Sequence, residues 1–114
     1  MSQRIIRVNE LLKREIGQIL RTDYQAKAVY ITITEVDTSP DLRHAKVHYS
    51  VLGDEKNERA AAQLLGRIGG TLRKRVAKHV TLKYLPHLEF VLDRSIARGT
   101  DLIERIDDIV SNDS

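Results

Sequence analysis

The fold is decided by the stretch Ala60-Ala-Ala-Gln-Leu-Leu-Gly66-Arg-Ile-Gly69-Gly70-Thr-Leu-Arg-Lys-Arg75-Val-Ala-Lys-His-Val80. Its apolar residues recur at helical spacing on both sides of the glycines and define one stripe. Each glycine inside a helix costs about 1 kcal/mol relative to alanine, so three in five positions disfavour a straight helix. We therefore expect a kinked helix pair that shares one buried stripe, with the kink at Ile68, Gly69 and Gly70. The stripe consists of Ala61, Leu64, Leu65, Ile68, Leu72 and Val76.

Basic residues gather just beyond these glycines. Residues 66–84 contain six arginines and lysines and no acidic residue. Positive charge next to backbone N–H groups at a helix start attracts anions such as phosphate. A solvated helix face is the competing interpretation, and in the opening helix Glu10 and Glu15 can pair with basic neighbours. The RNA-binding candidates are Arg4, Arg7, Arg14, Lys46, Arg67, Gly69, Gly70, Arg73, Lys74, Arg75, Lys78 and Lys83.

The rest of the chain supplies one helix and three strands around this pair. Apolar spacing predicts an amphipathic helix over residues 4–21. Alternation predicts strands over 29–36 and 44–52, joined as an antiparallel hairpin through a turn at Pro40. In the first strand Val29, Ile31 and Ile33 are expected to share one face. A third strand over 88–93 follows the helices and should run parallel to the second.

This order gives an α+β fold of the KH-like type II (αββααβ). The kinked helix pair is expected to lie on one face of a three-stranded mixed sheet, with a short C-terminal helix in addition. We divide the chain into residues 1–98, a KH-like RNA-binding domain, and residues 99–114, a short acidic C-terminal helix and tail. Whether that last helix packs on the domain is left open.

Composition limits the classes of function. The chain has 114 residues, a net charge of +3, no cysteine and no apolar run long enough to cross a bilayer. We therefore expect a monomeric cytoplasmic protein without a membrane partner. No nucleophile stands with a base, so no catalytic residue is assigned and the protein is not expected to be an enzyme. His44 and His48 share a strand face but lie too far apart for one metal ion, so neither metal nor cofactor is expected. Aromatic residues are few, and recognition should rest on phosphates and RNA shape.

Several short matches together resemble the ribosome-binding factor A family. They run in the family's order from residue 4 to about residue 106. The matching residues are Arg7-Val8, Glu10, Glu15-Ile16 and Ile19-Leu20 in the first helix, Val36, Ser39, Asp41-Leu42 and Ala45-Lys46-Val47 around the hairpin, Leu72-Arg73, and Pro86-His-Leu-Glu-Phe-Val-Leu-Asp-Arg-Ser95.

The resemblance implies a KH-like assembly factor. Such a protein binds the immature small ribosomal subunit, contacts its ribosomal RNA, assists rRNA maturation without catalysis and is associated with growth in the cold. An assembly GTPase is the implied agent of release, and ribosomal proteins are further possible partners. A generic single-stranded RNA-binding protein, or a protein-docking module that uses the acidic C-terminal stretch, remains the alternative. A steep loss of binding with salt would favour RNA.

The chain departs from the family at the kink. Where the family has alanine, any residue and glycine, this sequence has Ile68-Gly69-Gly70. Residues 66–69 also fit the GxxG loop with which ordinary KH domains clamp a nucleotide backbone. That loop would expose Ile68 and sacrifice roughly 1.5–3 kcal/mol of burial. The clamp and the buried kink therefore stay open as alternatives.

Overall fold

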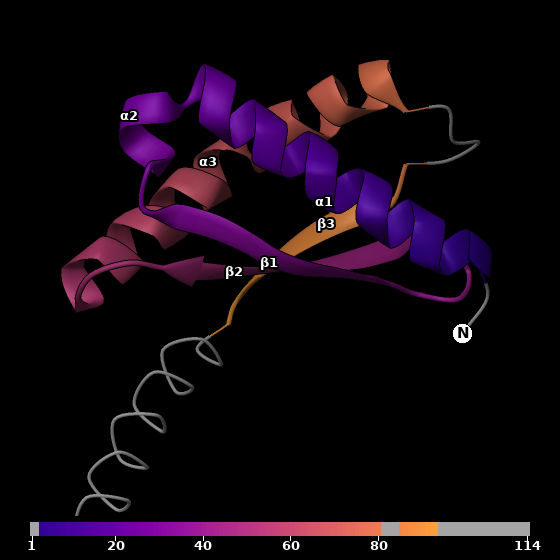
Figure 1. Ribbon diagram of the computed structural model, residues 1–114, viewed down its shortest axis with the longest axis horizontal. Coiled ribbons are helices and arrows are strands. Elements are labelled where there is room, and N and C mark those ends of the chain that lie inside the picture. The colour runs from indigo at the N-terminus through magenta and orange to yellow at the C-terminus, as the bar shows by residue number, and fades with distance from the viewer. Residues whose placement is uncertain (1–2, 81–84, 94–114) are drawn as a thin grey trace, which may run out of the picture.

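The computed structural model describes residues 3–80 and 85–93, and their order confirms the expected α+β architecture (Figure 1). The expected terminal helix and the boundary between residues 98 and 99 lie outside these residues. The elements are α1 (Gln3–Asp23), α2 (Gln25–Ala28), β1 (Ile31–Thr38), β2 (His44–Val51), α3 (Glu55–His79) and β3 (His87–Leu92).

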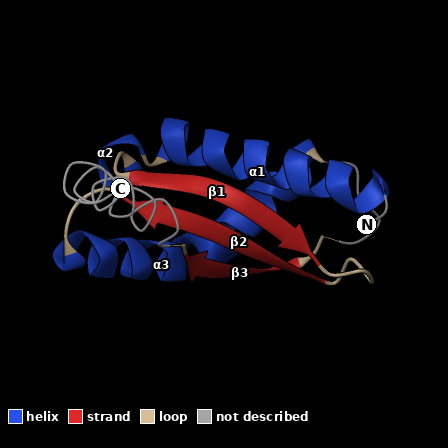
Figure 2. Ribbon diagram, turned by 60° about the horizontal axis from the view of Figure 1, so that its bottom comes forward, coloured by secondary structure: helices blue, strands red, loops and turns tan. Residues whose placement is uncertain are grey.

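The three strands form one mixed sheet in the order β1-β2-β3. β1 and β2 are antiparallel, and β2 and β3 are parallel because α3 returns the chain to the starting end of the sheet. Both parts of the predicted topology are confirmed. Figure 2 shows α1 and α3 on the same side of the sheet. Helix α1 packs mainly on β1, whereas α3 contacts β2, β3 and α1.

A bulge in β1 shifts which residues face the helices. Ile31 and Ile33 are buried, but after the register shift between Ile33 and Glu35 the buried residues are Val36 and Thr38. The bulge therefore lets both halves of β1 turn side chains inward, Ile31 and Ile33 before it and Val36 and Thr38 after it. The expectation for Val29 was wrong: it precedes the strand, and its exposed fraction is 80%.

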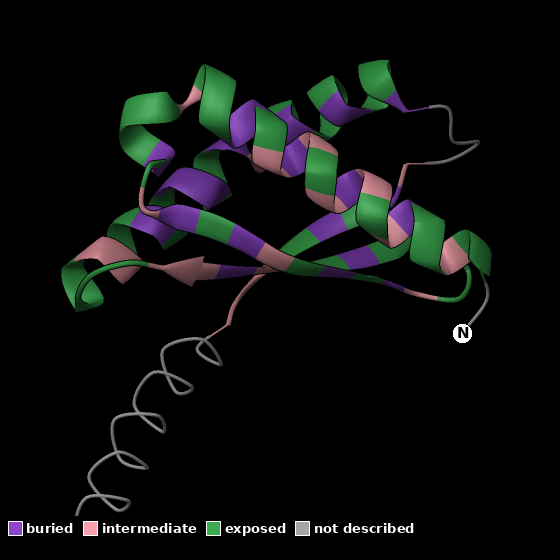
Figure 3. Cartoon of the chain, viewed as in Figure 1, coloured by how far each residue is buried: buried purple, intermediate pink, exposed green. Residues whose placement is uncertain are grey.

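The core lies between the helix layer and the inward face of the sheet (Figure 3). Helix α1 contributes Leu12 and Ile16, α3 contributes Leu65 and Leu72, and the central strand contributes Val47, all essentially inaccessible to solvent. Burying a side chain of this size stabilises the fold by about 1.5–3 kcal/mol. The two helix stripes read from the sequence are therefore the stripes that hold the layers together.

The glycine-rich centre is helical throughout. Residues 55–79 form one continuous helix, so no break separates the two halves of the expected kinked pair. The axis of α3 nevertheless changes direction about half-way along, as Figures 1 and 2 both show, which agrees with a kink. Ile68 is in the buried stripe with an exposed fraction of 8%. The structure therefore supports the buried kink over the exposed GxxG loop. The stripe outweighs the glycines because six buried positions offset a cost of about 1 kcal/mol at each glycine.

Candidate nucleic-acid interface

Three basic side chains form a line along the outer face of α3, away from the sheet. Arg67, Lys74 and Lys78 are spaced by seven and four residues, which places them on one helical face. All three are exposed, whereas the opposite stripe through Leu72 is buried. None of the three forms an ion pair or side-chain hydrogen bond with another residue in the described ranges. We call these three residues the outer line. Their charges are available to an external anion.

Arg73 lies beside the outer line but has a structural contact. Its Nε donates to the carbonyl oxygen of Pro86 at 3.2 Å, and its Nη2 donates to the carbonyl oxygen of Leu85 at 2.7 Å. The planar fork of arginine suits two neighbouring acceptors in this way. Arg73 therefore fastens the second half of α3 to the start of β3. At least part of its hydrogen-bonding capacity is already used inside the domain.

Arg75 also has an internal partner. Its Nη1 contacts the carboxylate of Asp23, at the end of α1, as a hydrogen-bonded ion pair. About half of the Arg75 side chain and just over a quarter of the Asp23 side chain are accessible to solvent. The pair joins the end of α1 to α3. The Asp23 carboxylate balances the positive charge of Arg75, so Arg75 is a weaker candidate for binding phosphate than Lys74.

The glycines of α3 have no steric reason to lack a side chain. A Cβ atom built on Gly66 or Gly70 would meet no atom within 4 Å, and one on Gly69 would lie 3.6 Å from Cε2 of Phe90, an ordinary contact. Close packing inside the domain therefore does not explain them. Gly70 is exposed next to the outer line, where a bare backbone permits close approach of a ligand.

The candidates on α1 share this side of the molecule. Arg7 and Arg14 are exposed and seven residues apart, so they follow one line on the face of α1 that is opposite Leu12. Arg4 is also exposed, but helical geometry places it nearer the flank of α1. Because α1 and α3 cover the same face of the sheet, their outer surfaces face the same way (Figure 2). The structure thus brings the basic residues of both helices into one layer.

Two candidates are not brought together with that layer. Lys46 is exposed on the other face of the sheet, and its strand partners are Asp37 on β1 and Glu89 on β3. Two flanking carboxylates lower the local positive potential. Lys83 lies outside the described residues. The candidate interface therefore contains fewer basic residues than the sequence predicted.

A hollow at one end of the outer line contains a basic residue that the sequence analysis missed. A cavity of about 640 Å³ opens between α2 and the first half of α3, with Lys27, Tyr30, Gly66 and Arg67 among its lining residues. The half-buried ring of Tyr30 adds an apolar surface to a lining that also contains two basic side chains. Lys27 carried no periodic signal in the sequence because α2 is only four residues long.

Other chemical groups have local structural explanations. Hydrogen bonds from the Ser39 hydroxyl and the Arg43 N–H lower the pKa of Asp41 in the hairpin turn. Burial raises the pKa of Tyr49 on β2. The rings of His44 and His87 meet edge to face with centroids 6.2 Å apart. Within residues 3–80 and 85–93 no cluster of three or more His, Asp or Glu side chains is arranged to hold a metal ion. Among the helices described, none has an apolar run sufficient to span a bilayer.

Comparison with known proteins now places the chain. The family model described as ribosome-binding factor A matches residues 4–106. The chain belongs to this family. A ribosome-binding factor A from Opitutus terrae is 42% identical over 109 residues, which cover 96% of this chain and 89% of that protein. Another from Akkermansia muciniphila is 37% identical over 115 residues, which cover 98% and 89%.

Solved structures of the ribosome-binding factor A family share the fold. The crystal structure of the protein from Thermus thermophilus matches with a TM-score of 0.68 at 23% identity, over 77% of this chain and 94% of that one. A Thermus thermophilus homology model fitted into a cryo-EM map of a 30S complex with ribosome-binding factor A matches with a TM-score of 0.63 at 24% identity, over 75% and 91%. These structures have a KH-like fold, so the type II KH-like architecture expected from the sequence is confirmed.

Proposed function

We propose that this protein is a stoichiometric, non-catalytic assembly factor of the small ribosomal subunit. It binds the immature subunit through its ribosomal RNA and assists rRNA maturation as a cytoplasmic monomer. Membership of the ribosome-binding factor A family supports the small ribosomal subunit as the binding partner, since a Thermus thermophilus member is described in a 30S complex. Release by an assembly GTPase, and contacts with ribosomal proteins, belong to the same proposal.

The outer line is the observation that best supports binding to RNA. Arg67, Lys74 and Lys78 present three positive charges on one helical face, with a bare backbone at Gly70 beside them. Charges without an internal partner are the ones that gain most from phosphate, because pairing releases counterions without breaking a bond in the domain. The hollow at Tyr30 would accept a base at one end of this path. Arg4, Arg7 and Arg14 extend the positive surface over α1, and Arg75 is secondary because Asp23 balances it.

Charge reversal on one helix tests this assignment. We compare Lys74→Glu/Lys78→Glu with the matched control Lys56→Glu/Arg59→Glu, which makes the same change of charge on the first turns of α3. Both variants should retain the circular dichroism spectrum of the wild type, since all four side chains are exposed. In sucrose gradients of cell extract, the wild type and the control should migrate with immature small subunits and dissociate as salt is raised. The outer-line variant should stay at the top of the gradient.

Two results would contradict the proposal in different ways. Retained particle binding by Lys74→Glu/Lys78→Glu would show that the outer line is not the interface. Failure of the wild type to migrate with small subunits at low salt would contradict the assembly role and leave a generic RNA-binding or protein-docking module. For purified RNA, neutralising one phosphate contributes about −0.7 to −0.9 to the log–log salt slope. The slope should therefore become shallower by roughly 1.4–1.8 when both lysines are replaced by glutamine.

A further inference from the structure

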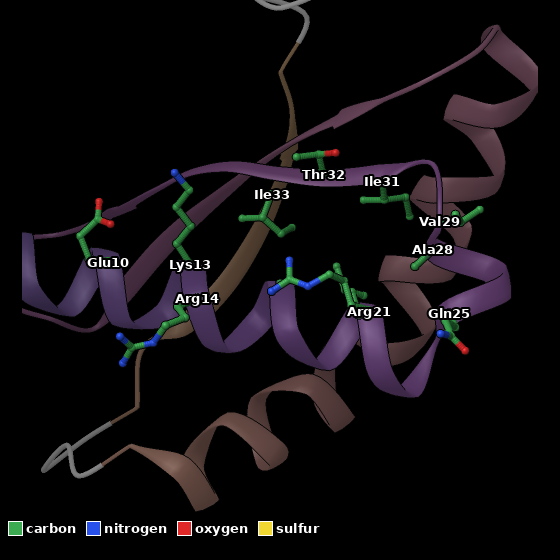
Figure 4. Close-up of a pocket in the computed structure, with 12 residues that line it drawn as sticks. Glu10, Lys13, Arg14, Arg21, Gln25, Ala28, Val29, Ile31, Thr32 and Ile33 are labelled. Carbon is green, nitrogen blue, oxygen red and sulfur yellow. The ribbon is translucent and has the colours of Figure 1, made fainter.

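We propose that the groove between α1 and the edge of β1 is a docking site for an extended, acidic peptide segment of a protein partner, which adds a short strand to the sheet. The site is separate from the outer line of α3. A cavity of about 610 Å³ lies there (Figure 4), and its lining includes Lys13, Gly17 and Arg21 of α1 and Ile31 and Ile33 of β1.

The backbone of β1 supplies the first argument. β1 is an edge strand that pairs only with β2 in the described part of the sheet. The Tyr30 carbonyl oxygen accepts from the Leu52 N–H at 2.9 Å, so the antiparallel ladder places Thr32 toward β2. The N–H and C=O groups of Ile31 and Ile33 therefore point away from β2, at the cavity. Alternating donors and acceptors on a strand edge match another peptide strand.

The remainder of this edge is protected, which makes the open part distinctive. Oδ1 of Asn9 on α1 accepts a hydrogen bond from the Thr38 N–H at 2.9 Å. The bulge between Ile33 and Glu35 interrupts the ladder between the two halves of the strand. Proteins commonly guard edge strands by such bulges and by side-chain contacts. Here these devices cover the second half of β1 and leave the outward N–H and C=O groups of Ile31 and Ile33 without a hydrogen-bond partner among the described residues.

Side chains around the cavity indicate what the incoming strand carries. In Figure 4 the side chain of Lys13 extends from α1 toward β1 and that of Arg21 lies back along α1, whereas Arg14 points away from the strand. Arg21 folds back so that its Nη1 would lie 3.2 Å from a Cβ at Gly17; the glycine thus provides the space that Arg21 uses. Within residues 3–80 and 85–93, the guanidinium of Arg21 makes one hydrogen bond to another side chain, from its Nη2 to Oε1 of Gln18 at 3.2 Å. Lys13 and Arg21 outnumber the one carboxylate among the described lining residues, that of Glu10, so the strand edge is complementary to carboxylates of the partner.

The apolar lining favours a peptide over a nucleic acid. Val29, at the mouth of the cavity, has an exposed fraction of 80%, and buried Leu20 and Ala28 form part of the lining. None of the described residues that line this cavity is aromatic, so they offer no stacking surface for a base. An alternating sequence would place acidic side chains near Arg21 and Lys13 and an aliphatic side chain on Val29. The proposed function does not depend on this site, since its RNA contact rests on the outer line of α3.

A designed peptide tests the site directly. The probe is a capped, fluorescein-labelled heptapeptide of alternating valine and glutamate, added to the ¹⁵N-labelled full chain. We expect the amide signals of Ile31 and Ile33 to shift and their hydrogen exchange to slow. Arg21→Glu should weaken peptide binding at least fivefold, whereas Lys56→Glu, with the same change of charge on α3, should leave it unchanged. The same peptide with alternate amides N-methylated, which removes the donors of one edge, should bind more weakly.

Three results would overturn the proposal. The first is unchanged amide exchange at Ile31 and Ile33 at millimolar peptide. The second is that the N-methylated peptide binds as tightly as the unmethylated one. The third is that Lys56→Glu weakens peptide binding as much as Arg21→Glu does, which would indicate unspecific attraction. Displacement of the peptide from these amides by a uridine dodecamer at equal concentration would assign the groove to nucleic acid instead. Circular dichroism confirms that each variant is folded. A negative result here leaves the subunit-binding experiment intact, because that experiment depends on Lys74 and Lys78 of the outer line.

Discussion

Replacing two glycines of α3 by alanine should make the domain more stable. At Gly66 and Gly70 a new Cβ meets no atom within 4 Å, so the helix propensity of alanine is gained without a clash. Each replacement is worth about 0.8–1 kcal/mol in a helix interior, or roughly 1.6–2 kcal/mol for the double variant. For a domain of this size, that corresponds to an increase in Tm of about 6–12 °C.

Urea unfolding followed by circular dichroism measures this difference, and Gly53→Ala provides the matched contrast. The same chemical change at Gly53 places a Cβ 1.9 Å from Nδ2 of Asn57, on a backbone with φ of +118°. We expect that variant to be destabilised. A loss of stability in Gly66→Ala/Gly70→Ala would refute the reasoning, because it would mean that the bend in α3 needs glycine in the free domain.

The same double variant connects stability with binding. Three glycines in the middle of α3 cost about 3 kcal/mol, and no contact among the described residues requires them. If RNA approaches the bare backbone beside Lys74, as we propose, added methyl groups should weaken binding to immature small subunits although the protein is more stable. Unchanged binding would assign the glycines to the bend alone.

Two further predictions concern local contacts. Asp54→Ala should lower the free energy of unfolding by about 1 kcal/mol in urea titrations, because the Asp54 carboxylate accepts from the Asn57 N–H at 3.2 Å as the N-cap of α3; an unchanged midpoint would contradict this role. Burial raises the pKa of Tyr49 from its usual value of 10.0. The contribution of the neutral Tyr49 side chain to the free energy of unfolding is therefore fully present below pH 10 and should be lost as pH rises through the pKa of the folded state. Urea midpoints from about pH 8 to about pH 11 should decline less in Tyr49→Phe than in the wild type.

The sequence was sufficient for elements whose side chains repeat over many residues. The stripes of α1 and α3 and the alternation of β2 have a periodic signal, and the intervening helix required β3 to run parallel to β2. The four-residue α2 has no such signal, and the bulge in β1 became visible only through pairing with β2. The two halves of α3 stay joined as one helix for an energetic reason: the tertiary gain from burying Ile68 and its stripe offsets the local cost of the glycines.

The candidate site was predictable as a charge pattern but not as a set of available charges. Partners 12 residues away for Arg73 and 52 residues away for Arg75 depend on the tertiary fold. Lys46 illustrates the converse, because its acidic neighbours Asp37 and Glu89 come from two other segments that flank β2 only in the assembled sheet. Long-range pairing therefore decided which basic residues remain for a ligand.

Arg73 and Arg75 make contacts inside the domain, whereas Lys74, which lies between them in sequence, is free for a ligand among the described residues. The two arginines reach sideways, to the residues before β3 and to the end of α1, and so hold α3 in the orientation that turns Lys74 outward. Arg73→Lys separates this positioning role from a direct phosphate contact, since lysine keeps the charge but lacks the planar fork. We expect Arg73→Lys to lose about 1 kcal/mol of stability, because one or both bonds to the Leu85 and Pro86 carbonyl oxygens fail. The salt slope of RNA binding should stay that of the wild type, because the number of phosphates neutralised is unchanged. Full stability together with weaker RNA binding would reverse the assignment, because it would show that the planar fork of Arg73 contacts phosphate and not the two carbonyl oxygens.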